Sequence, residues 1–204
     1  MLLHIHPENP EERKIEIVTE CLRDGGIIIY PTDTVYSLGC DINSHNAIEK
    51  MSRIKNIDVK AANYSLVCYD LSHLSDFVFS IDTPLYRIMK KSLPGAFTFI
   101  LKANSNVPKI FKSKKKTVGI RVPDNKICRM IVKGLGNPIT STSIHDILDN
   151  DDYITDAEEI YKEFENRVDI VIDGGYGHRT PSTVFDCSDG ELTLVRQGLG
   201  ILDT

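Results

Sequence analysis

Ile-Ile-Ile-Tyr-Pro-Thr-Asp-Thr-Val-Tyr-Ser-Leu-Gly, residues 27–39, joins an apolar run to a polar segment. The three isoleucines predict a strand, because short runs of branched apolar residues are typical of strands. Pro31 fixes the backbone after it, and Thr32, Asp33 and Thr34 then supply two hydroxyls and a carboxylate. Ligands of α/β sheets bind at strand ends, so this segment is a candidate site for a small polar ligand. A turn that caps a helix uses the same residue types and stays the alternative.

Helical and strand patterns alternate on both sides of this segment. The expected helices cover residues 11–23, 43–54, 83–89 and 125–133, and a last helix begins at a capping box formed by Thr155 and Glu158. The expected strands cover residues 27–29, 65–69, 96–102, 117–122, 138–140, 169–173, 182–186 and 191–196. Helices alternate with strands early and strands crowd the end, which indicates an α/β fold with a mixed sheet.

The composition fits a single domain over residues 1–204. Hydrophobic residues make up 41% of the chain, which is enough for one sizeable core. No stretch approaches the roughly 20 apolar residues that cross a bilayer. His4, His6 and Pro7 interrupt the N-terminal apolar run before it could form a signal peptide. We therefore expect a cytoplasmic protein that makes no contact with a membrane.

The cysteines predict buried free thiols. They are odd in number, and no two lie at metal-ligand spacing. Most of them stand next to apolar residues, as buried thiols usually do. The five positions are Cys21, Cys40, Cys68, Cys128 and Cys187.

The charge is unevenly distributed along the chain. The formal net charge is −5, from 24 basic and 29 acidic residues, which argues against a protein that coats nucleic acid indiscriminately. Residues 109–133 nevertheless hold nine basic side chains against one acid, Asp124, and residues 146–169 hold ten acids against two cations. This asymmetry predicts a basic face and an acidic face, and two ordinary solvated surfaces are the alternative.

Further polar segments lie at the expected element ends. Arg53 and Lys55 leave the second helix, where cations are favourable in any case. Arg121 ends a strand, and Ser141-Thr142-Ser143 forms a hydroxyl-rich segment after the next helix. An arginine fork beside hydroxyls is suited to clamp a carboxylate or a phosphate.

The last segment contains Ser182, and Arg196 follows it later in the chain. Taken together, the polar segments offer hydroxyls and cationic groups. No nucleophile is paired with a base, and the six histidines show neither metal-ligand spacing nor a triad pattern. We expect a site that acts through charge and hydrogen bonds, without a catalytic nucleophile or a metal held by the protein.

Six motifs, in order, resemble the YrdC/YciO family. They span the chain from Tyr30 to Gly198, and six in order are far more specific than any one of them. The motifs are Tyr-Pro-Thr-Asp-Thr-Val-Tyr-Ser-Leu-Gly (30–39), Pro-Gly-Ala-Phe-Thr-Phe-Ile-Leu (94–101), Val-Gly-Ile-Arg-Val-Pro (118–123), Ser-Thr-Ser (141–143), Pro-Ser-Thr-Val (181–184) and Val-Arg-Gln-Gly (195–198).

The resemblance implies an open twisted sheet flanked by helices, with a concave basic site for nucleotide and RNA. The best-known activity of the family joins L-threonine, bicarbonate and ATP into threonylcarbamoyl-adenylate, on the way to threonylcarbamoyladenosine in tRNA. ATP or AMP is then the expected ligand, with Mg²⁺ accompanying a triphosphate. The implied contacts are Thr32, Thr34, Arg121 and Ser182 for threonine, Lys55, Ser141, Ser143 and Arg196 for the nucleotide, and Lys112, Lys114, Lys115 and Lys116 for tRNA or double-stranded RNA.

The sequence departs from the synthase members at two places. Their K-x-R pair is broken here, because Ile57 stands two positions after Lys55, and Arg53 is the other cation nearby. Their Ser-Ala-Asn reads Ser143-Ile144-His145. This pattern, together with Asn63-Tyr64-Ser65-Leu66 and the run Lys114-Lys115-Lys116-Thr117-Val118-Gly119, is similar to the YciO branch. We therefore expect weak or no synthase activity.

Two interpretations stay open. The first is an enzyme that makes or cleaves an adenylate of the threonylcarbamoyl type, and the intact threonine motifs favour it. The second is a noncatalytic module for double-stranded RNA or tRNA, or a translation-associated factor, and the broken nucleotide motifs favour it. The sequence identifies no protein partner.

Overall fold

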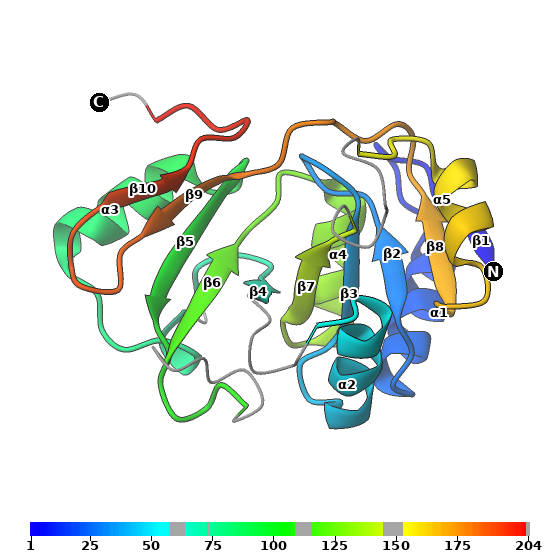
Figure 1. Cartoon of the computed structure of the whole chain (residues 1–204), viewed down its shortest axis with the longest axis horizontal. Coiled ribbons are helices and arrows are strands. Elements are labelled where there is room, and N and C mark those ends of the chain that lie inside the picture. Colours follow the sequence, from blue (N-terminus) through cyan, green and yellow to red (C-terminus); the bar gives the residue numbers. More distant parts are fainter. Residues whose placement is uncertain (58–63, 73, 109–115, 145–152, 203–204) are drawn as a thin grey trace.

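The computed structural model describes residues 1–57, 64–72, 74–108, 116–144 and 153–202. Its strands join into one ten-stranded sheet in the order β1-β8-β2-β3-β7-β4-β6-β5-β9-β10 (Figure 1). Parallel pairs such as β2–β8 and β4–β6 alternate with antiparallel pairs such as β3–β7, which confirms the predicted open mixed sheet. The strands are β1 (Leu2–His4), β2 (Ile28–Tyr30), β3 (Ser37–Asp41), β4 (Ser65–Val67), β5 (Phe97–Lys102), β6 (Thr117–Arg121), β7 (Ile139–Ser143), β8 (Ile170–Asp173), β9 (Thr183–Asp186) and β10 (Thr193–Arg196).

Side-chain caps set where most of the helices begin. Ser44, Asp82 and Asn125 each accept a hydrogen bond from the backbone N–H three positions on, which satisfies one of the free donors of a first turn. The last helix is capped by Asp156, which accepts from two backbone N–H groups, so the predicted capping box with Thr155 is wrong. The helices are α1 (Glu12–Arg23), α2 (His45–Ile54), α3 (Thr83–Ser92), α4 (Lys126–Leu135), α5 (Ala157–Phe164) and a short 3₁₀ helix, η1 (Leu74–Asp76).

Two strands of this sheet were not expected from the sequence. β1 pairs with β8 at one edge, and β3 lies near the middle of the sheet between β2 and β7. The second half of the polar segment, Ser37-Leu38-Gly39-Cys40-Asp41, is therefore a fully buried strand. Serine, glycine and aspartate are uncommon in strands, and these residues hide the pattern.

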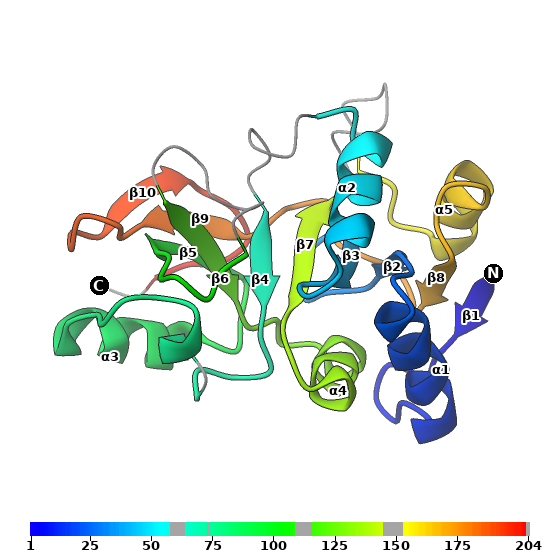
Figure 2. The same cartoon turned by 90° about the horizontal axis from the view of Figure 1, so that it is seen from below.

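The helices bury the sheet in two apolar clusters. α1 and α4 pack together on β2 and β8 through residues such as Leu22 and Ile131. α2 lies on the opposite side of β3 from α1 and α4 (Figure 2). Its Ile48 joins a larger cluster that also includes Met89 of α3 and Phe164 of α5. No helix within the described ranges is both long enough and apolar enough to span a membrane.

All five cysteines are free thiols, and all except Cys21 are buried. Burial raises the pKa of Cys68 and of Cys187 to about 12 and that of the half-buried Cys21 to about 11. The expectation of buried free thiols is therefore confirmed for four of the five positions.

We expect Cys21 to be the first cysteine that iodoacetamide modifies in the folded protein. The thiolate is the nucleophile, so a pKa raised to about 11 makes the rate at Cys21 rise about tenfold per pH unit through pH 10. A free thiol in an unfolded chain levels off near pH 8.5. Peptide mass spectrometry after timed labelling measures both rates, and labelling of Cys128 before Cys21 in the folded protein would contradict the expectation.

Candidate functional site

Small and polar residues occupy one face in the middle of the sheet. Ser141 on β7 is paired with Gly39 on one side and with Ser65 on the other. Ser65 is in turn paired with Gly119 on β6. Paired residues of neighbouring strands share a face, so four strands contribute small residues to the same row.

The residues two positions along each strand point the same way. Ser37 is paired with Ser143, next to the Gly39–Ser141 pair. Arg121 lies two residues beyond Gly119, and Thr98 lies two residues before Ile100, the partner of Gly119. A Cβ atom on Gly119 would stand 2.6 Å from Ser65 Oγ and 3.2 Å from Thr98 Cγ2. We call this set the polar row: Ser37, Ser65, Thr98, Arg121, Ser141 and Ser143.

Arg121 is held from one side by the turn between β2 and β3. Its Nη2 donates to Asp33 Oδ1 and to Thr34 Oγ1, at 3.0 Å each. Thr34 Oγ1 lies 3.1 Å from Thr32 Oγ1, whose hydroxyl also donates to a backbone carbonyl. Asp33 is fixed further by the backbone N–H of Asp124. The turn therefore positions the guanidinium through both of the predicted threonines.

Nε of Arg121 is buried and has no hydrogen-bond partner among the described residues. Buried donors are normally paired, and only 7% of the Arg121 surface is exposed. A donor left over from a guanidinium whose Nη2 is already fixed can serve an anionic oxygen from outside the protein.

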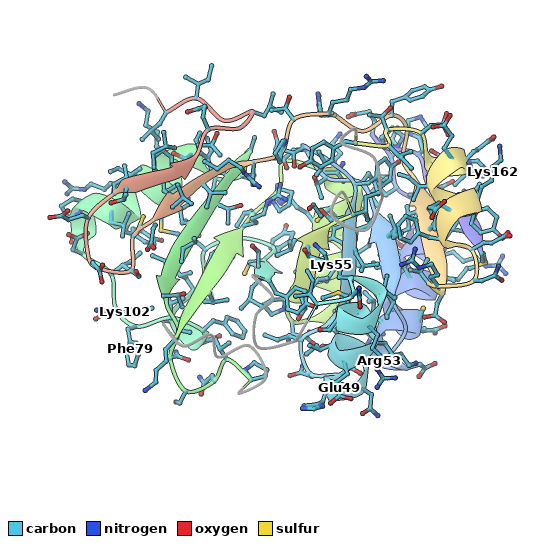
Figure 3. All side chains as sticks on the ribbon, viewed as in Figure 1. Glu49, Arg53, Lys55, Phe79, Lys102 and Lys162 are labelled. Carbon is cyan, nitrogen blue, oxygen red and sulfur yellow. The ribbon has the colours of Figure 1, made fainter. Side chains whose placement is uncertain are left out.

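Lys55 reaches the end of β7 from the C-terminus of α2. Its Nζ donates to Thr142 Oγ1 at 2.8 Å and to the backbone carbonyl of Ser143 at 3.2 Å, and the residue is buried. Figure 3 shows Lys55 lying toward the sheet, with Arg53 and Glu49 on the outer side of α2. Arg53 is 75% exposed and pairs with Glu49, so it does not share the position of Lys55.

A buried tyrosine bonds Ser141 on the same face of the sheet. Tyr30 OH and Ser141 Oγ lie 2.7 Å apart. Burial raises the pKa of Tyr30 far above its usual range, so its phenol stays protonated and can donate. Ser141 is thereby held in place next to Ser65.

Ser182 joins the polar row through Thr98. The two hydroxyls lie 2.8 Å apart and are buried. Arg196 on β10 donates through Nε and Nη2 to the carbonyl of Ser182, at 3.2 and 3.0 Å. The predicted residues therefore form three groups: Thr32, Thr34 and Arg121; Ser182 and Arg196; and Ser141 and Ser143 on one face of β7. Lys55 bonds Thr142 on the other face of β7 and the backbone carbonyl of Ser143. Their roles toward a ligand stay predictions.

The structure does not place Arg196 with the other residues predicted for the nucleotide. Those residues contact or belong to β7, and β4, β6, β5 and β9 separate β7 from β10. Arg196 instead shares the carbonyl of Ser182, which was predicted for the threonine side. Of the threonine-side residues, Arg121 on β6 and Ser182 just before β9 lie between β7 and β10 in the strand order, whereas Thr32 and Thr34 lie in the turn between β2 and β3.

Several predicted features fall outside these groups. Lys112, Lys114 and Lys115 lie outside the described residues, and Lys116 is exposed just before β6. Two cavities, of about 250 Å³ beside Tyr69 and Lys133 and about 330 Å³ beside Lys50 and Arg167, contain none of the predicted site residues. A concave basic site therefore stays a prediction.

The described ranges contain no group of three histidine, cysteine, aspartate or glutamate side chains suited to a metal ion. Asp33, the carboxylate of the site, is already bonded to Arg121 and to the N–H of Asp124. These residues do not fit a Mg²⁺ ion held by protein carboxylates.

Tyr30, Ser65 and Thr98 were not predicted as site residues, and Asp33 was predicted only as the carboxylate of the polar segment, without a role of its own. Thr98 had a usable signal, because it alternates with Phe97 and Phe99 along its strand and must face away from the core that they fill. The sequence around Ser65 and Tyr30 carried no such signal, because only the order of the strands in the sheet brings these residues beside Ser141.

Replacing Thr98 by valine is expected to lower the free energy of unfolding by about 1–3 kcal/mol, because the buried hydroxyl of Ser182 then loses its partner. Thr140→Val is the matched control: Thr140 Oγ1 is also buried, but it has no partner within the described ranges, so its loss should cost little. Urea unfolding of both variants measures the difference, and equal costs would show that the Thr98–Ser182 bond contributes nothing.

Comparisons with known proteins show the family and the fold of the chain. The Sua5/YciO/YrdC family model, described as "Telomere recombination", matches residues 20–198. Escherichia coli YciO, named as an uncharacterized protein, is 42% identical over 97% of this chain and 95% of its own length. Its crystal structure superposes with a TM-score of 0.91, at 41% identity, over 98% of this chain and 97% of that one.

Two synthase-type relatives are more distant. The threonylcarbamoyl-AMP synthase of Coxiella burnetii is 28% identical over 88% of this chain and 96% of its own length. The structure of P. abyssi Sua5 complexed with L-threonine has a TM-score of 0.87 at 25% identity, and the match covers 97% of this chain and 57% of that one. With the family model covering most of its length and the motifs in order, this chain belongs to the Sua5/YciO/YrdC family.

Proposed function

We propose that this protein binds L-threonine and an adenine nucleotide along the polar row and takes part in threonylcarbamoyl-adenylate chemistry for tRNA modification, with weakened synthase activity. The unpaired, buried Nε of Arg121 carries the proposal. It is a charged donor next to two threonine hydroxyls, and a carboxylate is an anion of suitable size for it. The L-threonine complex of P. abyssi Sua5 supports this choice of ligand.

In this proposal the carboxylate of L-threonine accepts from Arg121 Nε. Thr32, Thr34 and Ser182 supply hydroxyls for the amine and the side chain of the substrate. Asp33 keeps the guanidinium from turning toward solvent, because it binds Nη2. Substrate orientation of this kind lets the amine meet its reaction partner in one geometry.

The nucleotide lies over β7 in the same proposal. Lys55 presents a cation to the phosphates, and the hydroxyls of Ser141 and Ser143 bind phosphate or ribose oxygens. Arg196 belongs to this set only if the nucleotide extends across the polar row to Ser182. Mg²⁺ would be held by the phosphate oxygens, since the described carboxylates do not offer it a cage.

Two positions support weakened synthesis. Ile57 is half-buried where the synthase members have the arginine of K-x-R, so a bidentate phosphate donor is missing. Ile144 is fully buried in the core next to Ser143. A noncatalytic RNA-binding module stays the alternative function. The cytoplasmic location also stays a prediction. So does the single domain over residues 1–204, which the one continuous sheet supports.

Calorimetric titration with L-threonine, AMP and ATP tests the proposal. We expect L-threonine to bind, and AMP to suffer less than ATP from the missing arginine because it carries less phosphate charge. Pyrophosphate release that depends on both threonine and bicarbonate should be slow. Failure of L-threonine to bind would overturn the proposal, and release as fast as that of a complete synthase would overturn its weakened-activity part.

An RNA partner is proposed from the basic cluster at residues 109–133. Changing Lys114, Lys115 and Lys116 together to glutamine is expected to weaken RNA binding and to flatten its salt dependence by up to about 2–3 in log–log slope, because fewer counterions are released. Fluorescence anisotropy with a labelled duplex RNA across a salt series measures this. The triple change Lys90, Lys91 and Lys162 to glutamine is a control of equal charge, because these exposed lysines lie outside the basic cluster. Unchanged RNA binding by the first variant at low salt would show that Lys114, Lys115 and Lys116 are ordinary solvated residues.

A further inference from the structure

One connection crosses the molecule and displays a tyrosine beside the candidate site. Residues 174–182 run from β8, near one edge of the sheet, to β9, near the other (Figure 1). We call residues 174–178 the crossing segment. Its central residue, Tyr176, is 81% exposed.

The crossing segment is fixed to the turn that holds Arg121. Tyr36 OH donates to the carbonyl of Gly175 and accepts from Gly174 N–H. The N–H of His178 donates to the carbonyl of Thr34 at 2.9 Å, and that of Gly177 donates to the carbonyl of Thr155 at 2.9 Å. Bonds on both sides of Tyr176 therefore set the direction of its backbone.

Glycine is required for this close approach. A Cβ on Gly177 would lie 2.8 Å from the ring of the buried Tyr36, and Gly175 has a φ of 93°, in the left-handed region. The backbone is thus pressed onto Tyr36, and the intervening tyrosine is the residue turned outward.

We propose that Tyr176 is a stacking platform for an unpaired nucleobase of RNA, with Arg179 binding a neighbouring phosphate. This rests on the RNA partner in the proposed function. Aromatic rings interleaved with cations are the usual means of binding single-stranded nucleic acid. Because the crossing segment is already fixed, little backbone entropy is lost when a base settles on the ring.

The surroundings favour a base over a protein partner. Gly175, Gly177, His178 and Arg179 flank Tyr176 in the chain, so no large apolar residue adjoins it in the crossing segment. A protein hot spot needs an apolar patch to exclude water, whereas a single base needs only one ring face. The hydrogen bond from His178 to Thr34 places the backbone of Tyr176 within about 10 Å of the Thr34 carbonyl, given the reach of two residues.

The test compares Tyr176→Ala with Tyr176→Phe by fluorescence anisotropy of a labelled oligoadenylate. We expect the alanine variant to bind about tenfold more weakly and the phenylalanine variant to bind within about twofold of the parent, since the ring supplies the stacking energy. Phe79→Ala is the matched control: Phe79 is 60% exposed at a distant corner of the molecule (Figure 3) and should leave binding unchanged. Arg179→Gln should lower the salt slope by about one.

Titration with AMP and L-threonine separates this idea from the proposed function. Both should bind the alanine variant as they bind the parent, because Tyr176 lies outside the polar row. A tenfold loss of AMP affinity with no effect on oligoadenylate would assign the base to a free nucleotide and overturn the RNA source. Three results would overturn the stacking role of Tyr176. The first is that Tyr176→Ala binds both AMP and oligoadenylate as the parent does, and the second is that Tyr176→Ala and Tyr176→Phe lose oligoadenylate affinity equally. The third is that the parent binds AMP but does not bind oligoadenylate.

Discussion

Arg121→Met is expected to abolish L-threonine binding and to lower the free energy of unfolding by about 3–5 kcal/mol. Arg121 and Asp33 form an ion pair at 3.0 Å, and only 9% of each side chain is exposed. Removing the cation leaves a buried carboxylate without its partner, which costs far more than an exposed pair contributes. Urea unfolding gives the stability change, and calorimetry gives the threonine affinity.

Two further variants separate the charge from the ligand contact. Adding Asp33→Asn to Arg121→Met removes the stranded charge and should recover part of the lost stability, without restoring threonine binding. Arg53→Met is the matched control, because Arg53 is 75% exposed and pairs weakly with Glu49, so it should change the stability by less than about 1 kcal/mol. Full threonine affinity in folded Arg121→Met protein would contradict the assigned contact.

The local parts of the fold could be predicted because their causes are local. The helix expected over residues 43–54 begins at His45 after its cap Ser44, and the helix expected over residues 125–133 begins at Lys126 after its cap Asn125. The helix expected from residue 83 begins at Thr83, with Pro84 in its first turn. The capping of α5 by Asp156 was missed because Thr155 and Asp156 are both good caps in neighbouring positions, and local sequence does not decide between them.

The middle of the sheet could not be predicted in the same way. β3 was missed because Ser37, Gly39 and Asp41 are small or polar, yet tertiary packing makes all five of its residues buried. The same smallness is what lets the polar row form: Gly39 and Gly119 leave room where a Cβ atom would meet neighbours at 2.8 Å or less. The small residues that made β3 hard to predict are therefore the residues that leave space for the polar row.

The candidate site shows the same limit. Thr32, Thr34 and Arg121 carry recognisable motifs, and the structure brings them together through hydrogen bonds. The link from Thr98 to Ser182 depends on β5 and β9 being neighbours in the sheet. Thr98 and Ser182 are 84 positions apart, so no local sequence pattern predicts their contact.

Ile57→Arg is expected to raise the affinity for ATP by about ten- to a hundredfold. The change restores the arginine of the K-x-R pair two residues after Lys55, and a charge-assisted bidentate contact contributes about 1.5–3 kcal/mol. Arg53 does not replace it, because Arg53 lies on the outer side of α2 while Lys55 points to β7 (Figure 3). Calorimetric titration with ATP and AMP measures the gain, which should be smaller for AMP because fewer phosphate oxygens are present.

Asn56→Arg tests whether a bidentate contact or charge alone is responsible. Asn56 is exposed, has a φ of 52° and lies between Lys55 and Ile57, so an arginine there adds the same charge in a different direction. It should raise ATP affinity by no more than a few-fold, as expected for a screened surface charge. Equal gains from both variants would show that only net charge matters, and no gain from Ile57→Arg in folded protein would show that the missing arginine does not limit nucleotide binding. If Ile57→Arg also speeds threonine-dependent pyrophosphate release, the loss of that arginine is one cause of the weak synthesis that we propose.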